Sequence, residues 1–131
     1  YREDFYHAFL AGIFTGAGYM VDSNKEHGEG RSDVVVYDSI NARVAIFEAK
    51  YTKVLENLES ECDIALQQID DRMYAKEYED DYDQILCYGI SFFKKRCMVK
   101  KKWFTANLND WMSGVEISPQ KQIDPKIKLK K

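Results

Sequence analysis

The sequence lacks several patterns that would place it in a common class of protein. No apolar run approaches the roughly 18 residues that a membrane-spanning helix needs. The first residues carry Glu3 and Asp4, and the hydrophobic region typical of a secretory signal peptide does not follow them. We therefore expect a cytoplasmic protein without membrane contact. Because the chain starts at Tyr1 and not at methionine, we also expect it to be one part of a longer protein.

Cysteine and glycine are present, but not in the patterns that mark a known type of site. The three cysteines, Cys62, Cys87 and Cys97, are odd in number. No two of them are close enough in the sequence to form a C-x-x-C motif. We expect them to be reduced and buried. Gly28 and Gly30 belong to no Walker-type pattern, so they are predicted turn formers. A chain of 131 residues without repeats predicts one globular unit with a real core.

Charge is unevenly distributed, although the net charge is only −3. Residues 56–83 hold eleven acidic and two basic side chains, whereas residues 94–102 hold six basic side chains and no acidic one. Residues 121–131 add five lysines and one aspartate. A polyanion such as nucleic acid would be attracted to the two basic stretches and repelled by the acidic one. The alternative is that each stretch is simply a solvated surface.

Hydrophobic periodicity predicts an α/β protein with a central mixed sheet flanked by helices. The predicted helices cover residues 3–16 and 55–78. The predicted strands cover residues 19–21, 34–37, 43–50, 85–92 and 96–101. Within the strand predicted over residues 43–50, the apolar run 44–47 suggests a strand that is covered on both faces. Residues 22–32 are predicted to be a loop, residues 107–113 a short helix, and residues 119–131 a tail with little apolar content.

Two carboxylates and a lysine are predicted to meet at one end of this sheet. Side chains alternate along a strand, so Glu48 and Lys50 point to the same side. If the strand that begins at Asp33 is the antiparallel neighbour, Asp33 and Glu48 converge. Two carboxylates suit Mg²⁺, and a nearby lysine can orient or deprotonate an attacking water and stabilise a pentavalent phosphate. The alternative is an ion pair at a strand end, because an E-x-K triplet is common in a highly charged chain.

Four segments of the sequence match the motifs of one family. They are EDFYHAFL at residues 3–10, SNKEHGEGRSD at 23–33, IFEAK at 46–50 and ALQQI at 65–69, with Tyr74 beyond. From about residue 3 to about residue 100, the chain resembles the PD-(D/E)XK nuclease superfamily. Within that superfamily it is similar to the nuclease-like domain that lies C-terminal to an AAA-ATPase-like domain in bacterial proteins. It departs at one point, where Ser32-Asp33 replaces the Pro-Asp pair of the family name.

The resemblance implies a fold and a set of residue roles. The fold would be a restriction-endonuclease-like core of order αβββαββ over residues 1–102, with residues 103–131 as a C-terminal extension. The catalytic residues would be Asp33, Glu48, Lys50 and Gln68. The metal ligands for Mg²⁺ or Mn²⁺ would be Asp33, Glu48 and Glu3. An ATPase-like domain upstream in the same protein would be a partner.

Nucleic acid, DNA in particular, is the expected substrate of such a domain. Arg31 is a candidate phosphate contact, and the hairpin residues Lys94, Lys95 and Arg96 stand beside two phenylalanines that could stack on bases. The alternatives are that the basic residues are simply exposed on the surface and that the two phenylalanines pack in the core. We therefore carry two hypotheses: a metal-dependent nuclease, and a non-catalytic module with a nuclease fold that binds DNA or another protein.

Overall fold

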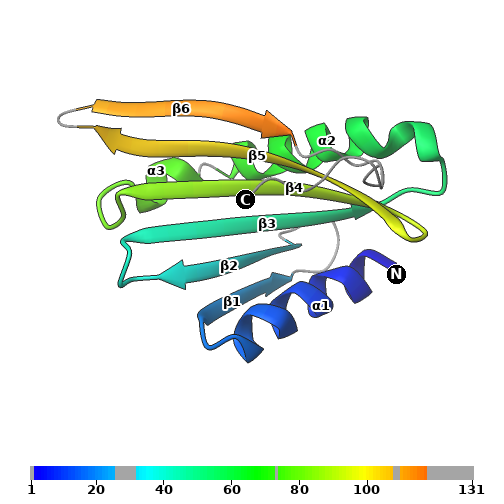
Figure 1. Ribbon diagram of the computed structural model, residues 1–131, viewed down its shortest axis with the longest axis horizontal. Coiled ribbons are helices and arrows are strands. Elements are labelled where there is room, and N and C mark those ends of the chain that lie inside the picture. The colour runs from blue at the N-terminus through cyan, green and yellow to red at the C-terminus, as the bar shows by residue number, and fades with distance from the viewer. Residues whose placement is uncertain (1, 26–31, 73, 108–109, 118–131) are drawn as a thin grey trace, which may run out of the picture.

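A six-stranded sheet with its strands in chain order organises the protein. The computed structural model describes residues 2–25, 32–72, 74–107 and 110–117 (Figure 1). All neighbouring strands are antiparallel except β3 and β4, which are parallel and are joined by a helical crossover. The strands are β1 (Met20–Lys25), β2 (Ser32–Asp38), β3 (Arg43–Tyr51), β4 (Gln84–Phe93), β5 (Arg96–Asn107) and β6 (Asp110–Ile117).

Helices cover the two faces of the sheet at different positions (Figure 1). The helix α1 (Arg2–Gly16) packs on β1, β2 and β3, whereas α2 (Leu58–Asp71) packs on β3, β4 and β5 from the opposite face. Two short helical segments flank α2, namely η1 (Leu55–Asn57) and α3 (Tyr74–Tyr78). Within the described ranges, no helix has the length and apolar character needed to cross a membrane.

The strand β3 contributes apolar side chains to a core on each face, as its continuous apolar run predicted. Val44 and Ile46 pack against Leu66 and Ile69 of α2. Phe47 belongs to the core under α1, where its ring lies 4.8 Å from the ring of Phe14, centroid to centroid. The buried face of α2 follows the spacing expected of an amphipathic helix, with Leu58, Cys62, Ala65, Leu66 and Ile69 buried.

One glycine lets α2 approach the sheet closely. A Cβ atom on Gly89, in β4, would lie 2.6 Å from the backbone oxygen of Cys62 and 3.1 Å from the Cβ of Ala65. A side chain at this position would therefore push α2 away from β4. Because Gly89 is the direct register partner of Glu48 in β3, this close approach sets how near α2 comes to the predicted site.

The observed elements correct several sequence predictions. The long helix predicted over residues 55–78 is three segments, since α2 ends at Asp71. The loop predicted over 22–32 is wrong for residues 22–25, which belong to β1, and for residue 32, which begins β2. Residues 26–31 of that prediction lie outside the described residues. The cysteine prediction is wrong for Cys97, which is exposed, whereas Cys62 and Cys87 are free and buried.

The short helix predicted over residues 107–113 is also wrong. Asn107 ends β5, and residues 110–113 belong to β6, which pairs with β5 along its length. The pairing is favoured by the contact between Gly114 and Trp103, which are register partners. A Cβ on Gly114 would lie 2.7 Å from the Trp103 ring, so the absence of a side chain leaves room for the indole. The predicted tail, residues 119–131, lies outside the described residues.

Candidate active site

The site is built on a row of residues that are register partners across four strands. Asn24 of β1 lies opposite Asp33 of β2, Asp33 lies opposite Glu48 of β3, and Glu48 lies opposite Gly89 of β4. The predicted convergence of Asp33 and Glu48 is therefore confirmed, because β2 and β3 are antiparallel neighbours. The two carboxylates lie on the sheet face that α2 covers, since they alternate with the residues that pack under α1.

Both carboxylates are almost completely removed from water, with exposed fractions of 0% for Asp33 and 1% for Glu48. Burying two adjacent carboxylates is costly unless opposite charges or hydrogen-bond donors offset the lost hydration. Asn24 supplies one donor, because its Nδ2 donates to Asp33 Oδ1 at 2.7 Å. Lys50 supplies a charge, with its Nζ 3.9 Å from Glu48 Oε2, so the predicted shared side of Glu48 and Lys50 is confirmed.

A second cation comes from the end of α2. Arg72 is the residue that caps this helix, and its Nη1 donates to Glu48 Oε1 at 3.1 Å. The same nitrogen lies 3.8 Å from Asp33 Oδ2. A single guanidinium nitrogen therefore lies within reach of one oxygen from each carboxylate. This residue was not among those predicted from the sequence, where Arg72 is one of two basic side chains in an acidic stretch.

One signal in the sequence could have identified Arg72. It stands four residues after Gln68, and residues with this spacing share a face of a helix. Gln68 was already expected to face the site, and it lies partly buried on α2 one turn before Arg72.

The electrostatics of the site concentrate on Glu48. Burial raises the pKa of its carboxyl from 4.5 to about 7, and the nearby charge of Asp33 adds to the rise. Lys50 and Arg72 act in the opposite direction because they favour the ionised form, but burial is the largest effect. With a pKa of about 7, the Glu48 carboxyl is partly protonated near neutral pH in the protein without metal.

Other predicted site residues are placed less centrally. Glu3 lies in the first turn of α1, and its Oε2 accepts a hydrogen bond from the backbone nitrogen of Tyr51 at 3.3 Å. It thus ties α1 to the end of β3. In the described ranges, no group of three or more His, Cys, Asp or Glu side chains is arranged to hold a metal ion. The structure does not bring Glu3 together with Asp33 and Glu48, and Arg31 lies outside the described residues.

Ion pairs join part of the acidic stretch of the sequence to part of the basic one. Lys100 Nζ donates to Asp63 Oδ1 at 2.6 Å and lies 3.0 Å from Glu59 Oε2. Lys102 Nζ donates to Asp70 Oδ2 at 2.8 Å. These pairs link β5 to α2, so two lysines of the predicted basic face hold the acidic helix in place.

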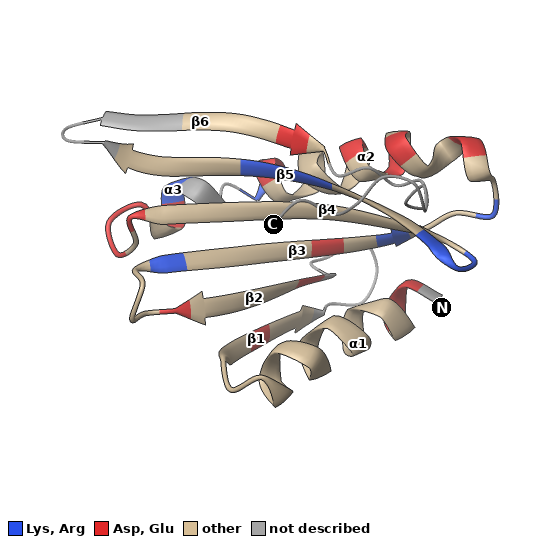
Figure 2. Cartoon of the chain, viewed as in Figure 1, with Lys and Arg blue, Asp and Glu red and all other residues tan. Residues whose placement is uncertain are grey.

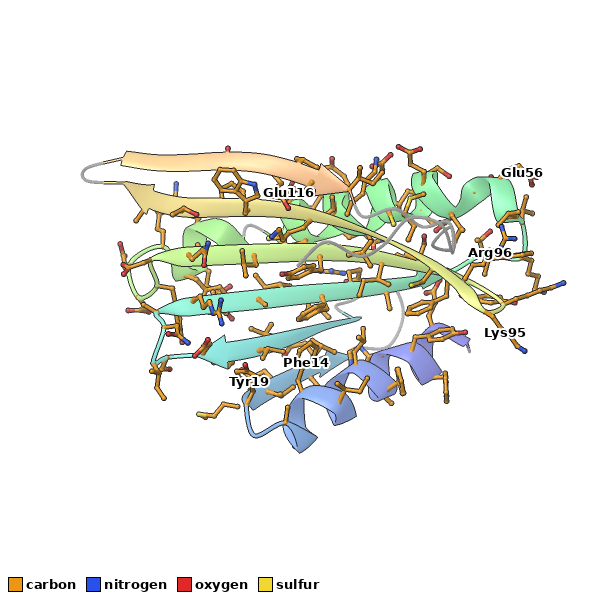
Figure 3. All side chains as sticks on the ribbon, viewed as in Figure 1. Phe14, Tyr19, Glu56, Lys95, Arg96 and Glu116 are labelled. Carbon is orange, nitrogen blue, oxygen red and sulfur yellow. The ribbon has the colours of Figure 1, made fainter. Side chains whose placement is uncertain are left out.

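Three basic residues of the same stretch project from the tip of the β4–β5 hairpin. Lys94, Lys95 and Arg96 are exposed there, and Figure 3 shows the side chains of Lys95 and Arg96 extending beyond the sheet. Figure 2 shows this basic tip at the end of the sheet where β3 also ends. With Leu55 and Phe93 the three residues line a hollow of about 390 Å³.

A second cavity, of about 380 Å³, lies where the C-terminal part of α1 meets the sheet. Its lining is mostly apolar and includes Phe14 and Tyr19 (Figure 3), with the ion pair of Asp38 and Arg43 beside them. None of its lining residues belongs to the cluster around Asp33 and Glu48. The candidate active site around Asp33 and Glu48 therefore lies outside this cavity.

Comparison with known proteins gives one match. Residues 1–102 match the sequence profile of the PD-(D/E)XK nuclease superfamily. The match includes both buried carboxylates, Lys50 and all of α2, and it stops within β5. No curated protein matches the chain, and no solved structure does either.

Proposed function

This chain belongs to the PD-(D/E)XK nuclease superfamily, and we propose that it is a nuclease that hydrolyses phosphodiester bonds in DNA with Mg²⁺ or Mn²⁺. One observation carries the proposal: Asp33 and Glu48 are buried register partners, and Lys50 lies on the same face of β3. Nucleases of this superfamily generally use divalent metal ions. The mixed sheet flanked by helices is consistent with their restriction-endonuclease-like fold.

The residues present fit a hard divalent cation. Mg²⁺ binds oxygen atoms and commonly takes one or two protein carboxylates, with water and substrate phosphate completing its coordination. Asp33 and Glu48 supply those carboxylates, and Asn24 holds Asp33 in position through its amide. When bound, the ion would act as a Lewis acid on the phosphate and lower the pKa of the attacking water.

Lys50 is the proposed catalytic lysine. Its side chain is only 14% exposed, and Glu48 holds its ammonium group at the edge of the carboxylate pair. From there it would donate to the attacking water or to a phosphate oxygen. Its charge would matter most in the transition state, where negative charge builds up on the phosphate. We assign Gln68, one turn before Arg72 on α2, the supporting role of a hydrogen-bond donor to the same groups.

The proposed contact with nucleic acid is the hairpin tip. Lys94, Lys95 and Arg96 would bind phosphates on either side of the cleaved bond, and Arg31 is a further candidate. A net charge of −3 predicts weak binding by this chain alone. We therefore propose that the chain acts in the cytoplasm, next to an ATPase-like domain of the same protein that supplies additional affinity.

A second candidate function rests on Arg72. Its guanidinium already bridges Asp33 and Glu48, so the buried charges are offset without any metal ion. A domain that had lost catalysis could keep this arrangement and serve only to bind DNA or a protein. The rival therefore predicts a stable fold and no cleavage.

The two functions are separated by a cleavage assay. Single- and double-stranded DNA and RNA are incubated with the protein and Mg²⁺, Mn²⁺ or a chelator, and Lys50→Ala serves as the control against a contaminating nuclease. Metal-dependent cleavage that Lys50→Ala loses supports the enzyme. If the wild-type protein cuts none of these substrates with either metal, the non-catalytic function is the better account.

A further inference from the structure

Arg72 occupies the position that a cation would take between the two buried carboxylates. One of its nitrogens lies 3.1 Å from an oxygen of Glu48 and 3.8 Å from an oxygen of Asp33. Lys50, a second cation among the described residues, lies beside Glu48, with 3.9 Å between its Nζ and Oε2. Within the described part of the chain, Arg72 is thus a cation that lies close to both carboxylates.

The side chain of Arg72 is also placed so that it can leave. It sits at the C-terminal cap of α2, where the helix ends, and not in a packed turn in mid-helix. Its side chain is 21% exposed, whereas Asp33 and Glu48 are 0% and 1% exposed. A long, partly solvated side chain at a helix end can swing toward water while its backbone stays in place.

We propose that Arg72 is an internal counter-ion, which stabilises the site without metal and is displaced from the two carboxylates when a divalent cation binds. The inference rests on the metal site of the proposed function. Mg²⁺ bound between Asp33 and Glu48 would compete with the guanidinium for the same carboxylate oxygens. Repulsion between the two cations acts in the same direction.

A thermodynamic consequence follows from this competition. If Arg72 contributes to stability only in the metal-free state, its removal lowers the stability of that state and leaves the metal-bound state nearly unchanged. By linkage, the same substitution must then tighten metal binding by an equivalent factor. A purely structural arginine would stabilise both states equally, and its removal would leave metal affinity unchanged.

The test compares Arg72→Met, which keeps an apolar stem but removes the charge, with the wild-type protein. Mn²⁺ affinity is measured by calorimetry, and the midpoint of thermal unfolding is measured in chelator and in saturating Mn²⁺. We expect the midpoint in chelator to fall, the two midpoints in Mn²⁺ to converge, and Mn²⁺ to bind roughly 5- to 150-fold more tightly, the range typical of coupled sites. If Arg72→Met is unfolded in chelator, Mn²⁺ is expected to restore the fold.

Lys102→Met is the matched control. It removes an equal charge, and it removes an ion pair between β5 and Asp70 of α2. It should lower the midpoint equally with and without Mn²⁺ and leave the affinity unchanged. The counter-ion role is overturned if Arg72→Met binds Mn²⁺ with the same affinity as the wild-type protein, or if Mn²⁺ cannot refold it. In either case, Mn²⁺ binding by the wild-type protein still supports the metal site. If neither the wild-type protein nor Arg72→Met binds Mn²⁺, the metal site of the proposed function fails and the counter-ion role fails with it.

Discussion

Asp33 lies directly opposite Glu48 in the antiparallel pair of β2 and β3. This relationship depends on register, because a slip by one residue would turn either side chain to the face covered by α1. The short connection between the two strands helps to fix the register. Asp38 accepts hydrogen bonds from Asn41 and Arg43 there, and Ala42 adopts a left-handed backbone conformation with a φ of 53°.

Removal of Asp33 should abolish metal binding. In calorimetry, Mn²⁺ should give a binding isotherm with the wild-type protein and none with Asp33→Ala, because only one carboxylate would remain. Asp38→Ala is the control, since it removes an acidic residue from the other end of the same strand. Asp33→Ala protein that still binds Mn²⁺ with wild-type affinity would exclude this residue as a ligand.

Lys50 should matter much more for rate than for folding. We expect Lys50→Ala to lower the rate of metal-dependent cleavage by about a hundredfold or more, the usual effect of losing one electrostatic stabiliser. Its unfolding free energy should fall only modestly, because 3.9 Å separates the ammonium group from the Glu48 carboxylate. Lys53→Ala, an exposed lysine three residues later, should leave both quantities unchanged. A Lys50→Ala protein that cuts as fast as wild type would show that this lysine is only a structural partner of Glu48.

Metal affinity should depend on pH through Glu48. Burial raises the pKa of this carboxyl to about 7, and a metal ion binds only the deprotonated form. The Mn²⁺ affinity should therefore rise by up to about tenfold for each pH unit below 7 and level off above it. Glu48→Gln, which cannot ionise, should lose most of the affinity at every pH. A wild-type affinity that is constant from pH 5.5 to 8 would show that no proton competes with the metal.

The stability of the metal-free protein should change with pH in the opposite direction. Because the folded pKa of Glu48 lies above its unfolded value of 4.5, the folded protein holds the proton more tightly. Its contribution to stability is complete below about pH 4.5 and is lost as the pH rises through about 7. The difference in unfolding free energy between wild type and Glu48→Gln, measured by denaturant titration in chelator, isolates this contribution from those of other groups. A difference that does not vary with pH would contradict the raised pKa.

Part of the site could be predicted from the sequence, because it depends on residues that are close together in the chain. Alternation along a strand puts Glu48 and Lys50 on one side, and a short turn puts Asp33 opposite Glu48. Arg72 could not be placed in this way, because its contact depends on where α2 ends. Apolar periodicity does not define that end, since the pattern continues toward residue 78.

The paired lysines and the strand β6 illustrate two further limits of prediction from the sequence. Lys100 and Lys102 share a face of β5 by simple alternation, but only the crossing of α2 over the sheet shows which acidic residues meet them. The strand β6 has no strong pattern of its own. It is specified by pairing with β5 and by the fit of Trp103 over Gly114. These contacts join different strands, whereas periodicity describes each strand by itself.

The hairpin tip should contribute most of the salt dependence of nucleic-acid binding. Replacing Lys94, Lys95 and Arg96 with glutamine should flatten the plot of log affinity against log salt by about one unit for each phosphate that is no longer neutralised. Lys100→Gln with Lys102→Gln is the control, because those lysines are paired with α2. It should lower stability and leave the slope unchanged. An unaltered slope in the triple variant would mean that the tip is only solvated.

The local β2–β3 pairing has a consequence for how the chain folds. Asp33 and Glu48 belong to neighbouring strands joined by a short connection, whereas Arg72 arrives only when α2 docks on β3 and β4. A hairpin that forms early therefore brings two negative charges together before their counter-charge is present. Docking of α2 relieves that repulsion as well as burying apolar surface. Assembly of the helix layer onto the sheet is thus coupled to neutralisation of the site.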